Sequence, residues 1–301
     1  MILVTAVAER NINTAAGLTD IRDGKKLGVN MKLLYSTDLH GDRRKYERIF
    51  EISKAQGVDI AINGGDLFPK TGNLFRQNEF ITGFLEKYFA RFEEEKIYYL
   101  CYPGNDDLKI FDKLFEDTGS RFEYIVPLAQ KKISIGEYEF IGMNWVVDYP
   151  FRLKDRCRKD TDNYIFQEQL GPGVLSTEEG YKNIDWFTYA GTLPTIEDEL
   201  KGLPLPEDFN KAIYIFHMPP ANLGLDQCRS GEKVGSAAIY DFLKKNQPLF
   251  SLHGHIHESP EMSGKWMAKI GDTVCIQPGQ RHGFDYVVID LKNVKYERFT
   301  E

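Results

Sequence analysis

The chain of 301 residues is 42% hydrophobic and 13% aromatic, and its formal net charge is −7. This size and composition are sufficient to bury the core of one large domain or of two smaller ones. The negative charge argues against a surface that binds nucleic acid through charge alone, although a local basic strip is compatible with it.

Residues 1–30 form a polar, glycine-containing extension that precedes the first convincing strand. Three interpretations of this segment stay open. It adds an N-terminal strand or hairpin, it is a flexible tail, or the start codon is assigned too early and Met31 is the true first residue. In each case we expect the main domain to span residues 31–301.

From Lys32 onward the sequence predicts a β-α-β-α-β order. Buried strands are expected at residues 33–36, 59–63 and 97–101, with one helix marked by Ile49, Ile52 and Ala55 and a second over residues 75–95. Crossovers of this kind generally produce parallel strands with helices on the outside of the sheet.

The pattern changes near Ile133, where residues 133–141 predict a hairpin in a second sheet. Periodicity is then lost from about residue 148 to 210, a stretch longer than an ordinary connection. We interpret it as an inserted cap in preference to a partly disordered linker. Its basic run, residues 152–159, would be a solvated face on a helix or would attract anionic substrates on a cap. The remaining predicted elements are a strand at 212–216, a helix at 236–245, and strands at 249–252, 274–276, 286–289 and 294–299.

Four acidic and histidine-rich clusters each follow a run of β-forming residues. They are Asp38-Leu39-His40, Gly64-Gly65-Asp66, Gly104-Asn105-Asp106-Asp107, and His217 followed by Gly254-His255-Ile256-His257. In an α/β fold such strand ends converge at the carboxyl edge of a sheet, where these folds place their sites. Together the clusters supply oxygen and imidazole ligands for two adjacent divalent metals.

The spacing within the clusters suits metal binding. Asp38 and His40 are one residue apart, so in an extended turn both side chains point to the same side and can bind one ion. The carboxylate of Asp66 has two oxygens with which to bridge two ions. Each cluster alone is a weak signal, because such segments are commonly ordinary turns. Their joint occurrence in this order, each at a predicted strand end, favours a metal site.

These motifs resemble the calcineurin-like metallophosphoesterase superfamily, whose pattern is Asp-x-His, Gly-Asp, Gly-Asn-His-Asp/Glu, a later His, and Gly-His-x-His. The match runs from Asp38 to His257. The resemblance implies an α/β fold with four layers, α/β/β/α, in which a double β-sandwich is flanked by helices, here with an inserted cap segment. Gln277-Pro278-Gly279 also resembles a turn often seen in these enzymes, although Gln stands where Asn is usual.

The same resemblance implies a dinuclear centre. The first ion would be bound by Asp38, His40, Asp66 and His257, and the second by Asp66, Asn105, His217 and His255. Mixed oxygen and imidazole ligands suit Mn, Fe or Zn better than Ca. Two such ions hold a hydroxide, neutralise phosphate oxygens and support an in-line displacement at a phosphate ester.

The chain departs from the family pattern at Asp106, where histidine is usual. An ionised carboxylate repels a phosphate monoester, which approaches two negative charges, more than a diester with one, so a phosphodiesterase is favoured. Alternatively, Asp106 is protonated by its anionic surroundings and acts as a catalytic acid, or it only hydrogen-bonds a neighbouring turn. Asn105 and Arg281 are candidate substrate-binding residues.

The leading hypothesis is a cytoplasmic, metal-dependent phosphodiesterase that acts on a small or nucleotide-like phosphate ester. The alternatives are a phosphomonoesterase or phosphoprotein phosphatase, and a metal-binding scaffold with weak catalysis. Four widely separated cysteines fit a reducing compartment. No run approaches the roughly 20 apolar residues that cross a bilayer, so no membrane partner is expected. No nucleic-acid surface and no oligomeric state can be read from the sequence.

Overall fold

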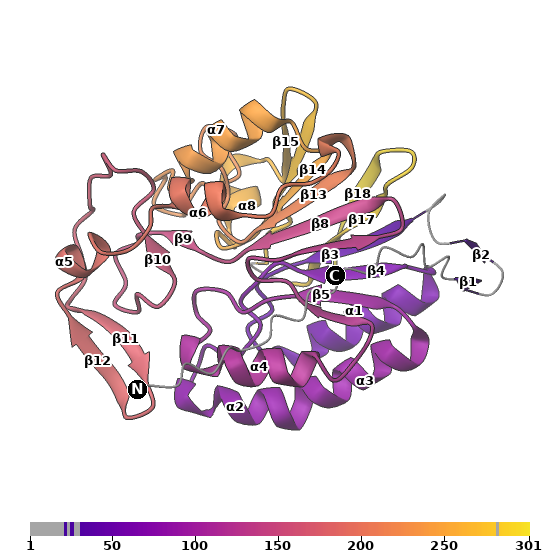
Figure 1. Ribbon diagram of the computed structural model, residues 1–301, viewed down its shortest axis with the longest axis horizontal. Helices are drawn as coiled ribbons and strands as arrows, with labels where there is room; N and C mark the ends of the chain where they lie inside the picture. Colours follow the sequence, from indigo (N-terminus) through magenta and orange to yellow (C-terminus); the bar gives the residue numbers. More distant parts are fainter. Residues whose placement is uncertain (1–20, 23–24, 27–30, 281–282) are drawn as a thin grey trace, which may run out of the picture.

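The computed structural model describes residues 21–22, 25–26, 31–280 and 283–301. Two six-stranded sheets pack face to face, and helices cover the outer face of each sheet (Figure 1). The four-layer α/β/β/α fold predicted from the sequence is therefore confirmed.

Two predicted features fall largely outside this part of the chain. Of the extension at residues 1–30, only β1 (Ile21–Arg22) and β2 (Lys25–Lys26) are described, and they pair antiparallel. The rest of the extension lies outside the described residues. Arg281, the candidate substrate-binding residue, and its neighbour His282 lie outside them as well.

The first sheet has the order β18-β17-β3-β4-β5-β6. Its strands are β3 (Lys32–Ser36), β4 (Ile60–Asn63), β5 (Tyr98–Cys101), β6 (Ile125–Pro127), β17 (Asp285–Asp290) and β18 (Lys295–Thr300). Strands β3 to β6 are parallel, whereas β17 is antiparallel to both of its neighbours. The loops after β3, β4 and β5 therefore leave the sheet at the same edge.

The second sheet has the order β15-β16-β14-β13-β8-β7. Its strands are β7 (Lys132–Ile135), β8 (Tyr138–Met143), β13 (Ala212–Phe216), β14 (Phe250–His253), β15 (Met267–Ile270) and β16 (Thr273–Ile276). The four inner strands are parallel, and the edge strands β7 and β15 pair antiparallel with β8 and β16. The predicted hairpin at residues 133–141 is confirmed as β7 and β8, whereas β15 was not predicted.

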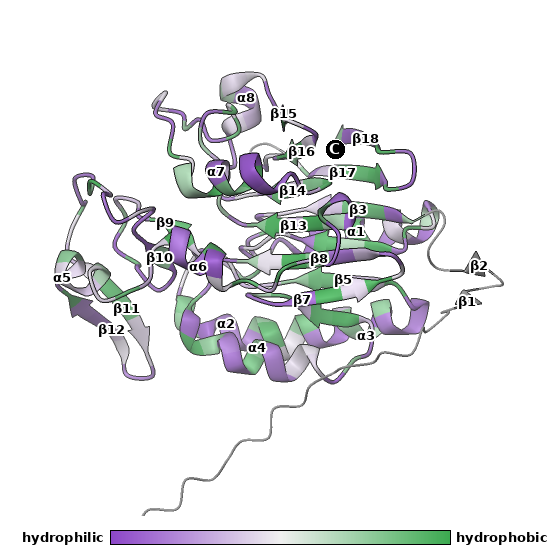
Figure 2. Ribbon diagram, turned by 45° about the horizontal axis from the view of Figure 1, so that its top comes forward, coloured by the Kyte–Doolittle hydropathy of each residue, from purple (hydrophilic) through white to green (hydrophobic). Residues whose placement is uncertain are grey.

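Successive side chains along a strand point alternately to the core between the sheets and to the outer helices, so each sheet is buried on both faces. In β3, Leu33 and Tyr35 point into the core between the sheets, while Leu34 packs against the outer helices. In β13, Ile213 and Ile215 face the same inner core, whereas the remaining residues face the helices of the second sheet. Because both faces are covered, these strands are continuous apolar runs (Figure 2).

Most of the helices form the two outer layers, and α5 (Trp186–Ala190) lies beside the sheets. The first layer contains α1 (Arg43–Ala55), α2 (Gln77–Phe80), α3 (Glu86–Glu95) and α4 (Asp112–Gly119), and the second side of the molecule carries α5 (Trp186–Ala190), α6 (Ile196–Gly202), α7 (Ala237–Asn246) and α8 (Ser259–Ser263). The helix predicted over residues 75–95 is interrupted by one wider π-turn at Ile81–Leu85. Among the described residues, no helix is both long and apolar enough to cross a membrane.

The irregular stretch from 148 to 210 is built from short elements. It contains a two-residue strand, β10 (Cys157–Arg158), paired with β9 (Val146–Val147), and the hairpin of β11 (Gly173–Thr177) and β12 (Gly180–Ile184). The hairpin and α5 extend beside the sheets, at the left of Figure 1. Whether this segment acts as a cap stays a prediction.

Three basic residues of this segment are buried, so both interpretations of its basic run are wrong for them. The Nζ atom of Lys154 lies 2.7 Å from Asp148 Oδ1, and Arg158 Nε lies 3.0 Å from Glu199 Oε1. Arg156 is 1% exposed and its Nε donates to the carbonyl of Gly104 at 2.7 Å. Arg156 therefore joins the segment to the rest of the domain, whereas the other two ion pairs lie within the segment, and none of the three charges faces solvent.

We expect the substitution Arg156→Met to lower the free energy of unfolding by about 2–3 kcal/mol. The change removes a buried guanidinium and leaves the Gly104 carbonyl and the half-buried Asp112 carboxylate without their donor. The loss is measured by urea denaturation. Arg44→Met is the matched control, because its ion pair with Asp42 is formed by a side chain that is 91% exposed. An equal loss in the two variants would contradict this account.

Candidate metal centre

All seven predicted ligand side chains lie together where strands of both sheets end. The first sheet places Asp38 and His40 after β3, Asp66 after β4 and Asn105 after β5, and the second places His217 directly after β13 and both His255 and His257 after β14. Contacts between side chains from the two sheets join these loops. The convergence predicted from the sequence is present in the structure.

Four of the seven residues have a left-handed backbone. The φ angles are 56° at Asp38, 47° at His40, 53° at Asp66 and 69° at His255. This conformation is uncommon for residues other than glycine and is concentrated at functional sites. Hydrogen bonds between adjacent turns maintain it, since Asp38 N donates to Gly65 O at 3.0 Å and His40 N donates to Asp66 O at 2.9 Å.

Two glycines in the motifs are required by the close approach of neighbouring turns. A Cβ atom on Gly104 would overlap the carboxylate and backbone nitrogen of Asp66. A Cβ atom on Gly254 would overlap the side chains of Thr37 and Asp38. The absence of a side chain at both positions therefore lets the turns approach closely enough for their ligands to meet.

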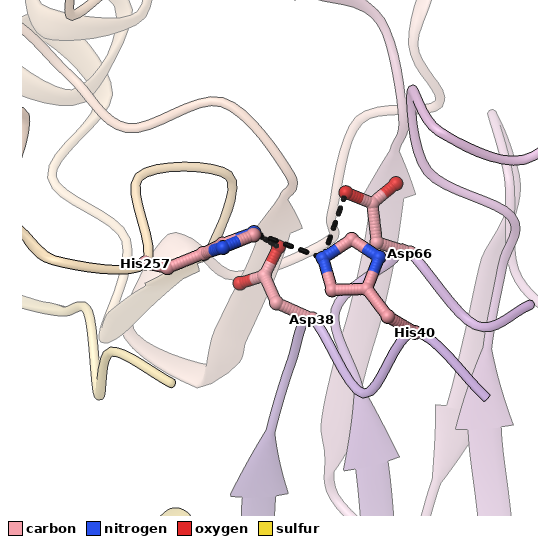
Figure 3. Close-up of side chains that lie close together, drawn as sticks. All are labelled: Asp38, His40, Asp66 and His257. Carbon is pink, nitrogen blue, oxygen red and sulfur yellow. Dashed lines mark hydrogen bonds and ion pairs between the residues drawn. The ribbon is translucent and has the colours of Figure 1, made fainter. Parts of the chain in front are cut away.

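The first group consists of Asp38, His40, Asp66 and His257 (Figure 3). One potential ligand atom from each of the four lies within 4.8 Å of the others. The Nε2 atoms of His40 and His257 are 3.0 Å apart, and His257 Nε2 is 3.4 Å from Asp38 Oδ1. Two imidazole nitrogens and two carboxylates thus face one small volume.

The second group consists of Asn105, His217 and His255, and Asp66 lies between the two groups. The Oδ1 atom of Asn105 is 2.9 Å from His217 Nε2 and 2.6 Å from His255 Nδ1. The Oδ2 atom of Asp66 is 3.8 Å from His40 Nε2 in the first group and 3.5 Å from His217 Nε2 in the second. This is the placement that a bridging carboxylate needs.

Two observations show that these residues fit divalent ions. At metal–ligand distances of about 2.0–2.2 Å, the ligands of one ion lie within about 4.4 Å of one another, close to the 4.8 Å spread of the first group. In addition, Asp38 and Asp66 are each 1% exposed, and no described Lys or Arg side chain forms an ion pair with either. Buried carboxylates need compensating positive charge, which metal ions would provide.

The pKa values reflect this burial. Burial lowers the pKa of His40 and of His255 to about 3, so both rings are neutral and able to coordinate. Burial alone would also lower the pKa of His217, but the charges of Asp66 and Asp38 raise it to about 9. A metal ion bound at His217 would therefore displace a proton. Despite its burial, the pKa of Asp38 is held at about 2 by His257.

Asp106, the predicted catalytic residue, lies at the edge of the first group. Its Oδ2 atom is 3.7 Å from His40 Nδ1, and its Oδ1 atom accepts a hydrogen bond of 3.0 Å from Asn105 Nδ2. Its backbone nitrogen donates to Asp66 Oδ1 at 2.9 Å. Burial, and then the charge of Asp66, raise the pKa of Asp106 to about 7. Its side chain is nevertheless 37% exposed, so it reaches the surface of the site.

Two residues to which the sequence analysis assigned no role position the ligands. The buried carboxylate of Asp107 accepts three backbone hydrogen bonds of 2.7–2.8 Å, from Leu67, Phe68 and Gly104, and so joins the turns after β4 and β5. The Nε2 atom of Gln277 donates to the carbonyl of Gly254, next to His255. The second acidic residue of the Asn-Asp-Asp motif and the Gln-Pro-Gly turn were the only sequence signals for these contacts.

Two cavities adjoin the ligands. The larger cavity, of about 580 Å³, is lined by Asn105, Asp106 and His255 and by residues 147–151. The smaller cavity, of about 470 Å³, is lined by residues that include Asp38 and His40. His257, Lys70 and Arg229 line both cavities, and neither of the two cations forms an ion pair within the described part of the chain. The sequence analysis did not single out Lys70 or Arg229.

Comparisons with known proteins agree with this geometry. A family model for the calcineurin-like phosphoesterases matches residues 31–259. The solved structure of TT1561 from Thermus thermophilus is 18% identical, with a TM-score of 0.54, and the match covers 90% of this chain and 99% of that one. A further solved structure has the same identity and coverage and a TM-score of 0.58. No curated protein sequence matches the chain.

A weaker similarity was also found to a dimetal phosphatase from Danio rerio. It is 10% identical, with a TM-score of 0.47, and the match covers 91% of this chain and 99% of that one. The two solved structures at 18% identity, with TM-scores of 0.54 and 0.58, establish the shared fold, and the substrate has to be inferred from the site itself.

We expect added Mn²⁺ to raise the thermal unfolding midpoint of the metal-free protein by about 5 °C. A ligand at 100 times its Kd stabilises the native state by about 2.7 kcal/mol, which corresponds to several degrees for a chain of this size. Asp66→Asn should lose this shift, and elemental analysis should find two ions per wild-type chain. Asp162→Asn, at a side chain that is 90% exposed, serves as the control. An equal shift in the Asp66 variant would exclude this residue as a ligand.

Proposed function

The chain belongs to the calcineurin-like phosphoesterase family, and on this premise we propose that it is a metal-dependent hydrolase of phosphate esters that prefers diesters. The position of Asp66 carries the proposal. Its carboxylate borders both ligand groups, at 3.8 Å from His40 Nε2 and 3.5 Å from His217 Nε2. A carboxylate shared in this way is what a two-ion centre for phosphate chemistry requires.

The proposed ligand assignment follows the two groups. Asp38, His40 and His257 would hold one ion, Asn105, His217 and His255 would hold the other, and Asp66 would contact both. The mixed oxygen and nitrogen donors suit Mn, Fe or Zn. Bound ions supply an acidified water and positive charge for the phosphate oxygens.

The chain itself keeps this arrangement ready for substrate. Asp107 and Gln277 hold the ligand turns through buried hydrogen bonds, so the donors need no rearrangement when substrate arrives. Asn105 lines the larger cavity, and we propose that its Nδ2 also contacts a phosphate oxygen.

Asp106 is the reason for the proposed diester preference. Its carboxyl group lines the larger cavity beside Asn105. Cations bound at the neighbouring ligands favour the ionised form of this group. An ionised carboxylate near the phosphate repels a dianionic monoester more strongly than a monoanionic diester. Asp106 is therefore proposed to act on substrate choice through its charge.

The hydrolase proposal is tested with bis(p-nitrophenyl) phosphate in the presence of Mn²⁺. Asp66→Asn should lower kcat/KM by about 100-fold or more. Substitution of a residue that only hydrogen-bonds to a metal ligand already lowers metal affinity or activity by about 10–100-fold. Asp162→Asn should leave the rate unchanged. Turnover that survives in the Asp66 variant would contradict the site assignment. A wild-type protein that binds two ions without turnover would support the scaffold interpretation instead.

The specificity proposal is tested by Asp106→Asn, which keeps the size of the side chain and removes its charge. The ratio of kcat/KM for p-nitrophenyl phosphate to that for bis(p-nitrophenyl) phosphate should rise by about tenfold. Repulsion between the Asp106 carboxylate and one additional negative charge a few ångströms away amounts to at least about 1.4 kcal/mol at an intermediate dielectric. A ratio that does not change would show that the charge of Asp106 has no part in substrate choice.

A further inference from the structure

The larger cavity has a size and position suited to one ester group, or arm, of a phosphodiester substrate. Its volume of about 580 Å³ falls within the range of about 300–1,000 Å³ that is usual for small-molecule sites. The ligands Asn105, His255 and His257 form one end of it. A phosphate held at the metal centre would therefore direct an ester group into this space.

An aromatic wall faces the cavity from the segment after β9. Phe151 is 62% exposed although it lines the cavity, and its ring centroid lies 5.9 Å from that of Tyr149. The ring of Tyr149 lies in turn 5.9 Å from that of the ligand His255. The exposed face of the Phe151 ring is therefore free to stack against an aromatic group of a substrate that enters the cavity.

Polar groups around the same cavity favour a heteroaromatic arm over an alkyl chain. Gln167 and Ser230 line it together with the carboxylates of Asp148 and Glu232. These groups also bond within the protein, since Lys154 donates to Asp148, Gln167 to the Asp148 carbonyl and Ser230 to Glu232. A nucleoside presents donors and acceptors around a flat ring that can use their remaining lone pairs and N–H groups, whereas an alkyl arm has none. The combination of an exposed aromatic ring and several hydrogen-bonding side chains is the chemistry that recognises a base and its sugar.

The smaller cavity provides room for a second arm. It reaches the first ligand group from the side of α1 and is lined by the cations Lys45, Lys70 and Arg229. Lys70, Arg229, His257 and the carboxylate of Glu258, which accepts the backbone N–H of Arg229, are shared with the larger cavity, so the two spaces meet next to the metal ligands. A phosphodiester has two ester groups, and it would use both cavities with its phosphate at their junction.

We propose that the substrate is a phosphodiester with a nucleoside as one ester group, bound in the larger cavity against Phe151, and with its second ester group in the smaller cavity. Lys70 and Arg229 face the phosphate from the junction. This inference rests on the proposed hydrolase function and specifies its substrate class. It also assigns to residues 147–151, the aromatic wall of the larger cavity, the role of selecting the ester group that binds there.

The test compares two diesters that release the same p-nitrophenolate, the p-nitrophenyl ester of thymidine 5′-monophosphate and ethyl p-nitrophenyl phosphate. With the full chain and Mn²⁺, kcat/KM for the thymidine ester should exceed that for the ethyl ester by about tenfold or more, mainly through a lower KM. Stacking of one base on an aromatic side chain contributes about 1–3 kcal/mol, or about 5- to 150-fold. Phe151→Ala should reduce this ratio to near unity.

Phe187→Ala is the matched control. Phe187 is 52% exposed, belongs to α5 and lines neither cavity, so the ratio should stay at its wild-type value. Equal hydrolysis of the two diesters by the wild-type protein would overturn the nucleoside assignment and leave the hydrolase function standing. A high ratio that survives Phe151→Ala would overturn the proposed wall. Failure to hydrolyse either diester would instead refute the proposed function.

Discussion

The structure of the site depends on the burial of one carboxylate between two groups of histidines. Asp66 is 1% exposed, accepts the backbone N–H of Asp106 and lies within 3.8 Å of the Nε2 atoms of both His40 and His217. Removing a carboxylate from water is unfavourable unless positive charge and hydrogen bonds surround it. The neighbouring turns provide the hydrogen bonds, and the arrangement of imidazoles provides the place for cations.

The strained backbone around this carboxylate is maintained by a second buried one. Asp107 accepts N–H groups from Leu67, Phe68 and Gly104, so the turn that carries Asp66 and the turn that carries Asn105 share a single anchor. Because Gly104 has no side chain, the two turns come into contact at this point. These hydrogen bonds hold the left-handed residues in place.

Much of the site could be predicted from the sequence, because its ligands lie in short motifs directly after strands. The strands themselves were recognisable because burial on both faces makes segments such as 33–36 and 212–216 almost continuously apolar. By contrast, α4 has Phe115 as its one large buried side chain and β6 has three residues, so neither produces a readable period. The sequence predicted one continuous helix over residues 75–95 and did not indicate the π-turn at Ile81–Leu85.

Charge in the sequence was the least reliable guide. The residues of the run at 152–159 look like a solvated surface, yet Arg156 is buried because its partners, Gly104 and Asp112, are brought to it from distant parts of the chain. Lys70 and Arg229 are isolated cations in the sequence, and only the fold places both beside His257. Such pairings depend on tertiary structure, which a linear pattern does not contain.

The hydrogen bond from Arg156 to the Gly104 carbonyl also joins the segment at 148–210 to the turn that carries Asn105. When this segment detaches locally, the carbonyl of Gly104, which precedes Asn105, loses its donor, while the N–H of Gly104 stays bound to Asp107. This bond couples local opening of the segment to the order of the turn that carries Asn105. A covalent tether that restrained the segment would therefore also restrain the turn that carries Asn105.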